Sequence, residues 1–224
     1  KGNFATHNMI IDIVKSNFKI IIFGFVFTFF SSIGQSFFIG LFNSNIRAEL
    51  NITHGEFGAI YGTATLCSSI TLIWLGKKID ELKLVNYSIL VTLFLFIAAL
   101  FFSYVNGLIF LLVGIFFLRL SGQGLMAHTA STAVSRYFER RRGKALSYIW
   151  LGMSLGEFLL PILIVYLLTF IYWRDLWIQT SIVILLILPA FSYFTVKDIA
   201  ISSREKDNEK NINKFIPAKS WTRR

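Results

Sequence analysis

Six long apolar segments divide the chain, near residues 19–42, 57–75, 86–104, 108–132, 145–170 and 174–195. Each has about the 20 mostly apolar residues that an α-helix needs to cross the roughly 30 Å hydrocarbon core of a bilayer. Only 15% of the residues are charged, whereas a soluble domain has about 25%. The segments therefore predict an all-α integral membrane protein with six transmembrane helices.

Basic residues gather between alternate segments and give the chain a predicted orientation. All but three of the 22 Lys and Arg residues lie in one of four places. These are before or at the start of the first segment, in the second-to-third connection, in the fourth-to-fifth connection, and after the sixth segment. Arg47 and Arg174 lie at the alternate connections, and Arg119 lies within the fourth segment. By the positive-inside rule, both ends of the chain are cytoplasmic. We expect a cytoplasmic N-terminal segment (1–18), a six-helix bundle (19–195) and a cytoplasmic linker (196–224).

The charge distribution and the motifs of the sequence limit the partners and the chemistry of this chain. The formal charge of +10 reflects membrane topology and not a nucleic-acid partner, so we expect the lipid bilayer and a small solute as partners. Enzyme motifs such as a phosphate-binding Gly-rich loop, His-Glu-x-x-His or Gly-x-Ser-x-Gly do not occur. Cys67 is the single cysteine, which excludes a disulfide framework and a multi-cysteine metal site. We predict no enzymatic activity, no cofactor and no metal.

A weak internal repeat relates the two halves of the chain. A shift of 88 residues aligns Gly34-Gln35 with Gly122-Gln123, and Gly55 with Gly143. Two units of three helices would be inverted relative to each other in the membrane, as in many transporters. The repeat then predicts that segments one and four face each other across a central cavity. The alternative is six independent helices.

Only two charged residues lie well inside the segments, Arg119 and Glu157. At about 1.5 Å per residue, both fall near the bilayer midplane, where a charge costs at least about 2.5–3.5 kcal/mol on insertion scales. One interpretation is a structural ion pair between segments four and five. The functional interpretation makes Arg119 an anchor for an anionic or polar substrate and Glu157 a group whose protonation changes with occupancy.

Helical spacing adds further candidates in the fourth segment. At 100° per residue, Gln123 shares a face with Arg119, together with Gly122, Met126 and Ala130. His128 falls on the opposite face, where a hydrogen bond between helices is the simpler interpretation and proton handling the other.

Two further polar residues are candidates in the first and second segments. Gln35 offers two donors and one acceptor at membrane depth, which suits contact with a polar substrate. Tyr61 lies among small and hydroxylated residues of the second segment. Close helix packing explains such residues equally well, so both interpretations stay open.

Several motifs together resemble the major facilitator superfamily, over essentially the whole chain. Gly76-Lys77-Lys78-Ile79-Asp80 is similar to the first half of the family's Gly-x-x-x-Asp loop signature, and Arg119-x-x-Gly122-Gln123-Gly124 resembles its Arg-x-x-x-Gly element. The run from Arg136 to Ala145 is similar to the loop before the fifth span, and Trp173-Arg174 also resembles the family.

The resemblance implies the N-terminal six-helix half of a 12-helix transporter, built as two inverted three-helix repeats, with a C-terminal six-helix half missing from this chain. It also implies a cytoplasmic gate at Gly76, in which Asp80 pairs with basic residues around Arg136 and Arg142. The antiporter signature Gly-x-x-x-Gly-Pro is half present, because Glu157 stands where the proline would be.

We therefore predict a secondary transporter, in the plasma membrane (the inner membrane of a bacterium), that moves a small solute by alternating access. An organic anion is the candidate solute, bound by Arg119, Gln123 and Gln35, and we expect proton coupling at Glu157. The alternatives are a multidrug-type effluxer, a receptor or scaffold that does not transport, and a self-contained six-helix channel or carrier that dimerises.

Overall fold

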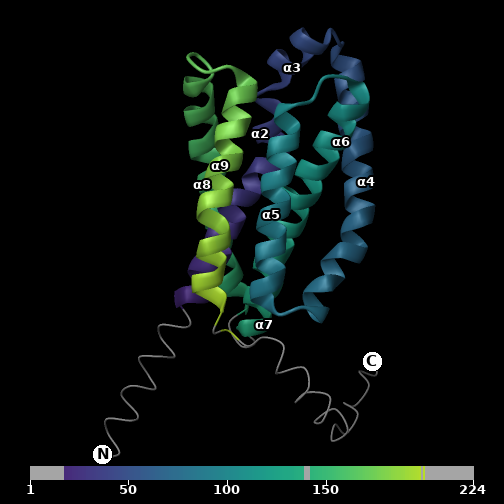
Figure 1. Cartoon of the computed structure of the whole chain (residues 1–224). Helices are drawn as coiled ribbons and strands as arrows, with labels where there is room; N and C mark the ends of the chain where they lie inside the picture. Colours follow the sequence, from purple (N-terminus) through teal and green to yellow (C-terminus); the bar gives the residue numbers. More distant parts are fainter. Residues whose placement is uncertain (1–17, 139–141, 198, 200–224) are drawn as a thin grey trace, which may run out of the picture.

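The computed structural model describes residues 18–138, 142–197 and 199, which form a bundle of long helices joined by short connections (Figure 1). In these ranges, six helical spans are long and apolar enough to cross a membrane: Phe18–Gly40, His54–Glu81, Leu84–Ser103, Leu108–Tyr137, Arg142–Leu167 and Trp173–Val196. The prediction of an all-α fold with six spans is confirmed. The predicted N-terminal segment and almost all of the linker lie outside the described residues.

Local signals explain where the second span begins and ends. α4 (His54–Glu81) starts with a capping box, in which the Thr53 hydroxyl accepts from the Glu56 amide and the Glu56 carboxylate accepts from the Thr53 amide. The helix continues past residue 75, the predicted end, through the charged residues that follow. Lys78 and Glu81 pair at 2.6 Å within this last turn.

The first span is not one continuous helix. Residues 18–31 are helical, η1 (Ser32–Gly34) is a short 3-10 turn, and α2 (Ser36–Gly40) resumes the helix. Between them, Gln35 has the extended backbone angles φ −81° and ψ 158°. A third piece, α3 (Asn43–Leu50), then leads into the first connection and ends at left-handed Asn51. The break lies within the span, five residues before its end at Gly40, and leaves Gln35 with extended backbone there.

The fourth span changes its helix type in the middle. α6 (Leu108–Leu118) passes into a π-helical stretch, η2 (Arg119–Met126), and then into α7 (Ala127–Tyr137). Because π-helical hydrogen bonds run from i to i+5, the assumption of 100° per residue is wrong here. Within the predicted face, Arg119 is buried and Gln123 is half-buried.

Spans one and four cross in direct backbone contact. A Cβ atom placed on Gly122 would lie 2.7 Å from the Cα and the N of Gly34, and one on Gly34 would lie 2.3 Å from the Leu118 carbonyl oxygen. At this crossing, the two spans pack together and are not separated by the cavity that the repeat predicted. The inverted arrangement of the two three-helix units remains a prediction.

Small residues also let span five pack closely on span one. α8 (Arg142–Leu167) places Gly152 where a Cβ would lie 2.1 Å from the Phe25 carbonyl oxygen, and Gly156 where it would lie 2.3 Å from the Ser32 hydroxyl. This spacing of two glycines is a common helix-packing motif in membranes. The half-present antiporter signature therefore has a packing role in this structure.

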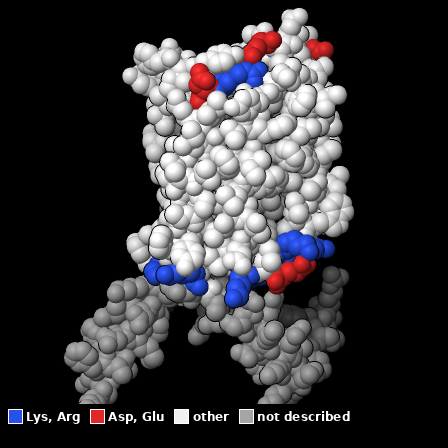
Figure 2. Space-filling model, in the orientation of Figure 1, with Lys and Arg blue, Asp and Glu red and all other residues white. Residues whose placement is uncertain are grey.

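The third and sixth spans complete the bundle. α5 (Leu84–Ser103) and α9 (Trp173–Val196) pack side by side (Figure 1). Near one end, Trp177 of α9 is fully buried and contacts the rings of Phe38, Phe42 and Phe102. Figure 2 shows Lys, Arg, Asp and Glu of the described chain at the two ends of the bundle, with an uncharged band between them on this face. This distribution suits a bilayer.

Candidate functional site

The change of helix type in span four positions Arg119, the first residue of the π-helical stretch. Its side chain is 7% exposed. Nη1 donates to the Ser36 hydroxyl at 3.2 Å and to the Gly34 carbonyl oxygen at 3.4 Å, and the guanidinium carbon lies 5.3 Å from the centre of the Tyr61 ring. All three partners are neutral. The structure thus holds a buried cation by hydrogen bonds and a cation–π contact alone.

Among the described residues, Arg119 and two hydroxyl groups of α4 have buried polar atoms without a hydrogen-bond partner. In the described part of the chain, Nε of Arg119 and the hydroxyls of Tyr61 and Thr65 are buried without a hydrogen-bond partner. Tyr61 and Thr65 lie one turn apart on α4. Buried polar groups normally have partners, and a buried charge is normally paired. A bound anion or polar solute would satisfy these atoms.

The broken first span brings Gln35 to the same place. The acceptors of Arg119 are the residues on either side of Gln35 in the chain, Gly34 and Ser36. Gln35 is 8% exposed, and its Nε2 lies 3.9 Å from the sulfur of Met153, which is a weak acceptor. Sequence reasoning missed Gly34 and Ser36 as partners of Arg119, because nothing in the pattern indicates that the helix breaks at Gln35.

Glu157 does not share this cluster. Its side chain lies on the exposed side of α8, and among the described residues it forms no ion pair with Arg119. The structural Arg–Glu pair considered from the sequence is therefore absent in this state. Glu157 instead lies on an unpartnered face of a membrane-spanning helix.

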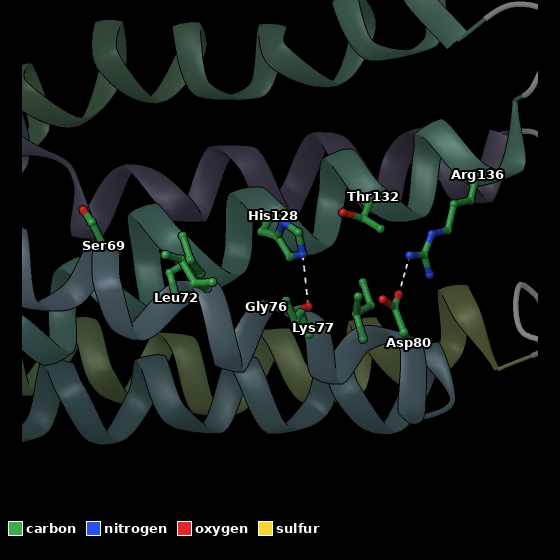
Figure 3. A pocket seen from close by; sticks show the side chains of 10 residues that line it. Ser69, Leu72, Gly76, Lys77, Asp80, His128, Thr132 and Arg136 are labelled. Carbon is green, nitrogen blue, oxygen red and sulfur yellow. Dashed lines mark hydrogen bonds and ion pairs between the residues drawn. The ribbon is translucent and has the colours of Figure 1, made fainter.

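A second polar feature lies between α4 and α7, toward the end of the bundle that holds the α4–α5 connection (Figure 3). It is a cavity of about 360 Å³, lined by side chains that include Ser69, Lys77, Asp80, His128, Thr132 and Arg136. The Nε2 atom of His128 lies 3.1 Å from the Gly76 carbonyl oxygen. A Cβ on Gly76 would lie 3.3 Å from that nitrogen, so the glycine allows the imidazole to approach. This is the hydrogen bond between helices that the sequence favoured for His128.

The predicted gate residues meet at the mouth of this cavity. Arg136 donates to the Asp80 carboxylate in an ion pair between α7 and α4 (Figure 3). Arg142 does not join them, and its Nε donates to the Ser135 carbonyl oxygen at 3.2 Å. Asp80 is 46% exposed, so water screens the pair and it is worth little as a stabilising contact.

A charged cluster at the opposite end was not anticipated. The Glu49 carboxylate of α3 accepts from Tyr172, from Trp173 Nε1 at 2.7 Å and from Arg174 Nε at 2.9 Å. Arg174 also donates to the Ser103 carbonyl oxygen at 2.7 Å, which ties α9 to the end of α5. The available signal was that Glu49 and Arg174 carry opposite charges in two connections with few charged residues, but their distance in sequence hid the contact.

The contacts in this cluster shift the pKa values of Glu49 and Tyr172. Burial acts to raise the pKa of the Glu49 carboxyl, but the hydrogen bonds from Tyr172, Arg174 and Trp173 outweigh it and lower that pKa below its usual value. The hydrogen bond to the Glu49 carboxylate raises the pKa of the Tyr172 phenol, and burial adds to the effect. The carboxylate is therefore the form that the fold favours.

In the described ranges, no group of three or more His, Cys, Asp or Glu side chains is placed to hold a metal ion. The described residues place polar groups around Arg119 inside the bundle and contacts at each end that tie the helices together.

Comparison with known proteins agrees with this geometry. Residues 24–223 match the family model of the Major Facilitator Superfamily. Searches of curated proteins and of solved structures gave no match. Members of this family are membrane transporters and not enzymes. The match spans most of the 224 residues, and the chain therefore belongs to the major facilitator superfamily.

Proposed function

We propose that this chain is the N-terminal six-helix unit of a secondary transporter that carries a small organic anion by alternating access. The observation that supports this most is Arg119, a buried cation at mid-span that has only neutral partners in the described chain. A carboxylate would pair with the guanidinium in the dry interior of the bundle. Gln35 and Gln123 lie next to the residues that cross there and would supply neutral contacts.

The conformational cycle in this proposal uses the two polar ends. The Asp80–Arg136 pair and the His128–Gly76 contact tie α4 to α7 at the end with the α4–α5 connection, which the charge distribution predicts to be cytoplasmic. An exposed ion pair is weak enough to break and re-form during transport. A C-terminal six-helix unit would complete the pathway, and Glu157 on the exposed side of α8 would supply proton linkage.

Uptake by the complete protein in proteoliposomes tests the anion site. The probes are radiolabelled mono- and dicarboxylates, with a neutral sugar of similar size. We expect Arg119→Ala to abolish carboxylate uptake and Arg119→Lys to restore only part of it, because the ammonium lacks the planar guanidinium fork. Arg47→Ala is the matched control, since Arg47 lies in α3, in the first connection, where its Nε donates to Asn43. Normal uptake by Arg119→Ala would remove Arg119 from the mechanism.

A receptor or scaffold remains the second candidate, because a helical bundle can keep this fold without transporting. Gln35→Cys and Gln123→Cys, each in a Cys67→Ser background, distinguish the two. A transporter exposes both positions to a water-soluble thiol reagent in at least one state, and a transported solute should protect them. A scaffold would leave both unreactive behind packed apolar side chains.

A further inference from the structure

A second, largely apolar depression lies between α4 and α5 and is separate from the polar cavity at α7. It has a volume of about 250 Å³, and its lining includes Leu75 of α4, Leu82 just after α4, Leu90 and Phe94 of α5, and Leu125 of span four. Leu90 is 55% exposed, so the depression opens on the outer surface of the bundle. We call it the α4–α5 groove.

The groove lies where membrane lipid would meet the protein. Both of its walls are membrane-spanning helices, and it lies next to the short α4–α5 connection at their ends. Tyr87 helps to shape one wall, because its hydroxyl donates to the Leu75 carbonyl oxygen at 3.1 Å and is thereby engaged within the protein. An apolar groove at this depth is filled most simply by a hydrocarbon chain.

One charged side chain lines the groove, and it is basic. Lys78 lies at its rim and is 53% exposed. Its neighbour Asp80 lines the other cavity, across α4, where it pairs with Arg136. Lys83 adds a second basic residue in the connection. A lysine can lay its stem along apolar surface while its ammonium reaches the head-group region.

Glu81 is the one acidic competitor for this ammonium. It pairs with Lys78 at 2.6 Å, but it is 60% exposed, so the pair is screened by water and weak. A lipid phosphate can therefore replace the carboxylate or share the ammonium with it. The basic side chain above an apolar slot matches a ligand that has an anionic head and a hydrocarbon chain.

We propose that the α4–α5 groove binds an anionic phospholipid, with an acyl chain between Leu82, Leu90 and Phe94 and the phosphate on Lys78. Lipid binding here is independent of the proposed transport function, because the groove lies on the outer surface of the bundle and not at the cluster around Arg119. The occupant is a lipid of the leaflet at this end of the bundle.

Native mass spectrometry of the complete protein tests the proposal. The protein is reconstituted with phosphatidylglycerol or phosphatidylcholine of identical chains and then stripped with mild detergent. We expect phosphatidylglycerol to be retained preferentially. Lys78→Gln should reduce this preference about fivefold, the factor that corresponds to ~1 kcal/mol per basic residue at an anionic surface. Glu81→Gln should increase it, and Lys144→Gln, a basic residue elsewhere at this end, should leave it unchanged.

A second pair of variants tests the groove itself. Leu90→Trp fills the slot and should reduce retention of both lipids, whereas Leu186→Trp makes the same change at an exposed position of α9 outside the groove. Equal retention by these two variants would overturn the proposal. So would equal lipid preference in Lys78→Gln and Lys144→Gln. Failure of any lipid to remain bound to the wild type would mean that another protein segment covers the groove, and would also overturn it.

Discussion

Individual charged residues in this chain are held in contrasting ways. Arg119 is buried among neutral partners, Glu49 accepts hydrogen bonds from three neighbours, and Glu157 lies exposed on a membrane-spanning helix. The cost of a charge depends on the partners that replace water. We therefore expect a substitution at each of these residues, or a change of pH, to have a different effect on transport or stability.

Glu157 is the candidate for proton linkage. Glu157→Gln keeps the size and polarity of the side chain but removes the titratable group. We expect solute exchange across the membrane to persist in this variant and uptake driven by a proton gradient to be lost, as measured in proteoliposomes with and without an uncoupler. Glu81→Gln is the control. Uncoupler-sensitive uptake by Glu157→Gln would show that the coupling group lies elsewhere.

Glu49 predicts a pH-dependent stability. Because its pKa is lowered in the folded chain, its contribution is fully present above its ordinary pKa of 4.5 and is lost as the pH falls through the lower folded value. Glu49→Gln should lower Tm at pH 7 by roughly 2–4 °C, corresponding to ~1 kcal/mol for a chain of this size. The difference from wild type should shrink below pH 4.5, as measured by thermal unfolding in detergent at several pH values.

The control for this measurement is Glu81→Gln, which removes a carboxylate from an exposed pair at the other end of the bundle. It should change Tm little at any pH, because screening makes such pairs weak. A constant difference between Glu49→Gln and wild type down to low pH would contradict an electrostatic role for Glu49.

At the scale of whole helices, the interruptions in spans one and four determine which groups lie next to Arg119. Span one breaks at Gln35 and span four turns π-helical at Arg119, and the two interruptions lie at the same crossing. Irregular backbone at membrane depth is tolerated where it is buried in protein. Here it brings backbone acceptors of span one within reach of the guanidinium of span four.

The crossing depends on the absence of side chains at two glycines. Gly122→Ala would place a Cβ 2.7 Å from the backbone of Gly34, where neither chain can yield without moving a helix. We expect a loss of about 1–3 kcal/mol in the free energy of unfolding, the usual cost of overpacking. Loss of anion binding should accompany it, since the partners of Arg119 are displaced.

Gly62→Ala is the matched control, because a Cβ at Gly62 would meet nothing within 4 Å. Alanine is the better helix former by up to about 1 kcal/mol, so this variant should be unchanged or slightly stabilised. Thermal unfolding of the two variants in the same detergent provides the comparison. Equal stability of Gly122→Ala and wild type would show that spans one and four cross less closely than described.

The whole molecule is organised by its uncharged middle and charged ends (Figure 2). The α4–α5 connection and the end of α7 lie at one end, and the Glu49–Arg174 cluster lies at the other (Figure 1). α4 and α8 are the spans with the lowest buried share. In the proposed transporter, a C-terminal six-helix unit would pack on the exposed face of α8 and on the face of α4 away from the α4–α5 groove.

The predicted orientation is tested by cysteine labelling of the complete protein. In a Cys67→Ser background, Arg47→Cys should react with a membrane-impermeant thiol reagent in intact cells, and Lys144→Cys should react only in inverted vesicles. Both positions lie outside the apolar part of the spans. The reverse pattern would mean that the basic connections are not cytoplasmic.

The sequence predicted the spans well because hydrocarbon imposes a simple rule of length and apolarity, which local composition satisfies. Ends were less well predicted, as at α4, because capping and terminal ion pairs extend helices past their apolar residues. The contact of His128 with another helix was correctly favoured. The π-helical stretch from Arg119 to Met126 was not predicted, because it has no signal in a regular 100° pattern.

The sequence by itself determined that this chain is a six-span membrane protein, that Arg119 is the charged residue within its fourth apolar segment (108–132), and which family its motifs resemble. Only the tertiary structure decided what Arg119 contacts: Ser36 and Gly34 at a break in span one and Tyr61 on α4. The reason is that insertion into a bilayer depends on the hydropathy of each segment alone. The partners of a buried charge, in contrast, depend on how segments far apart in sequence cross.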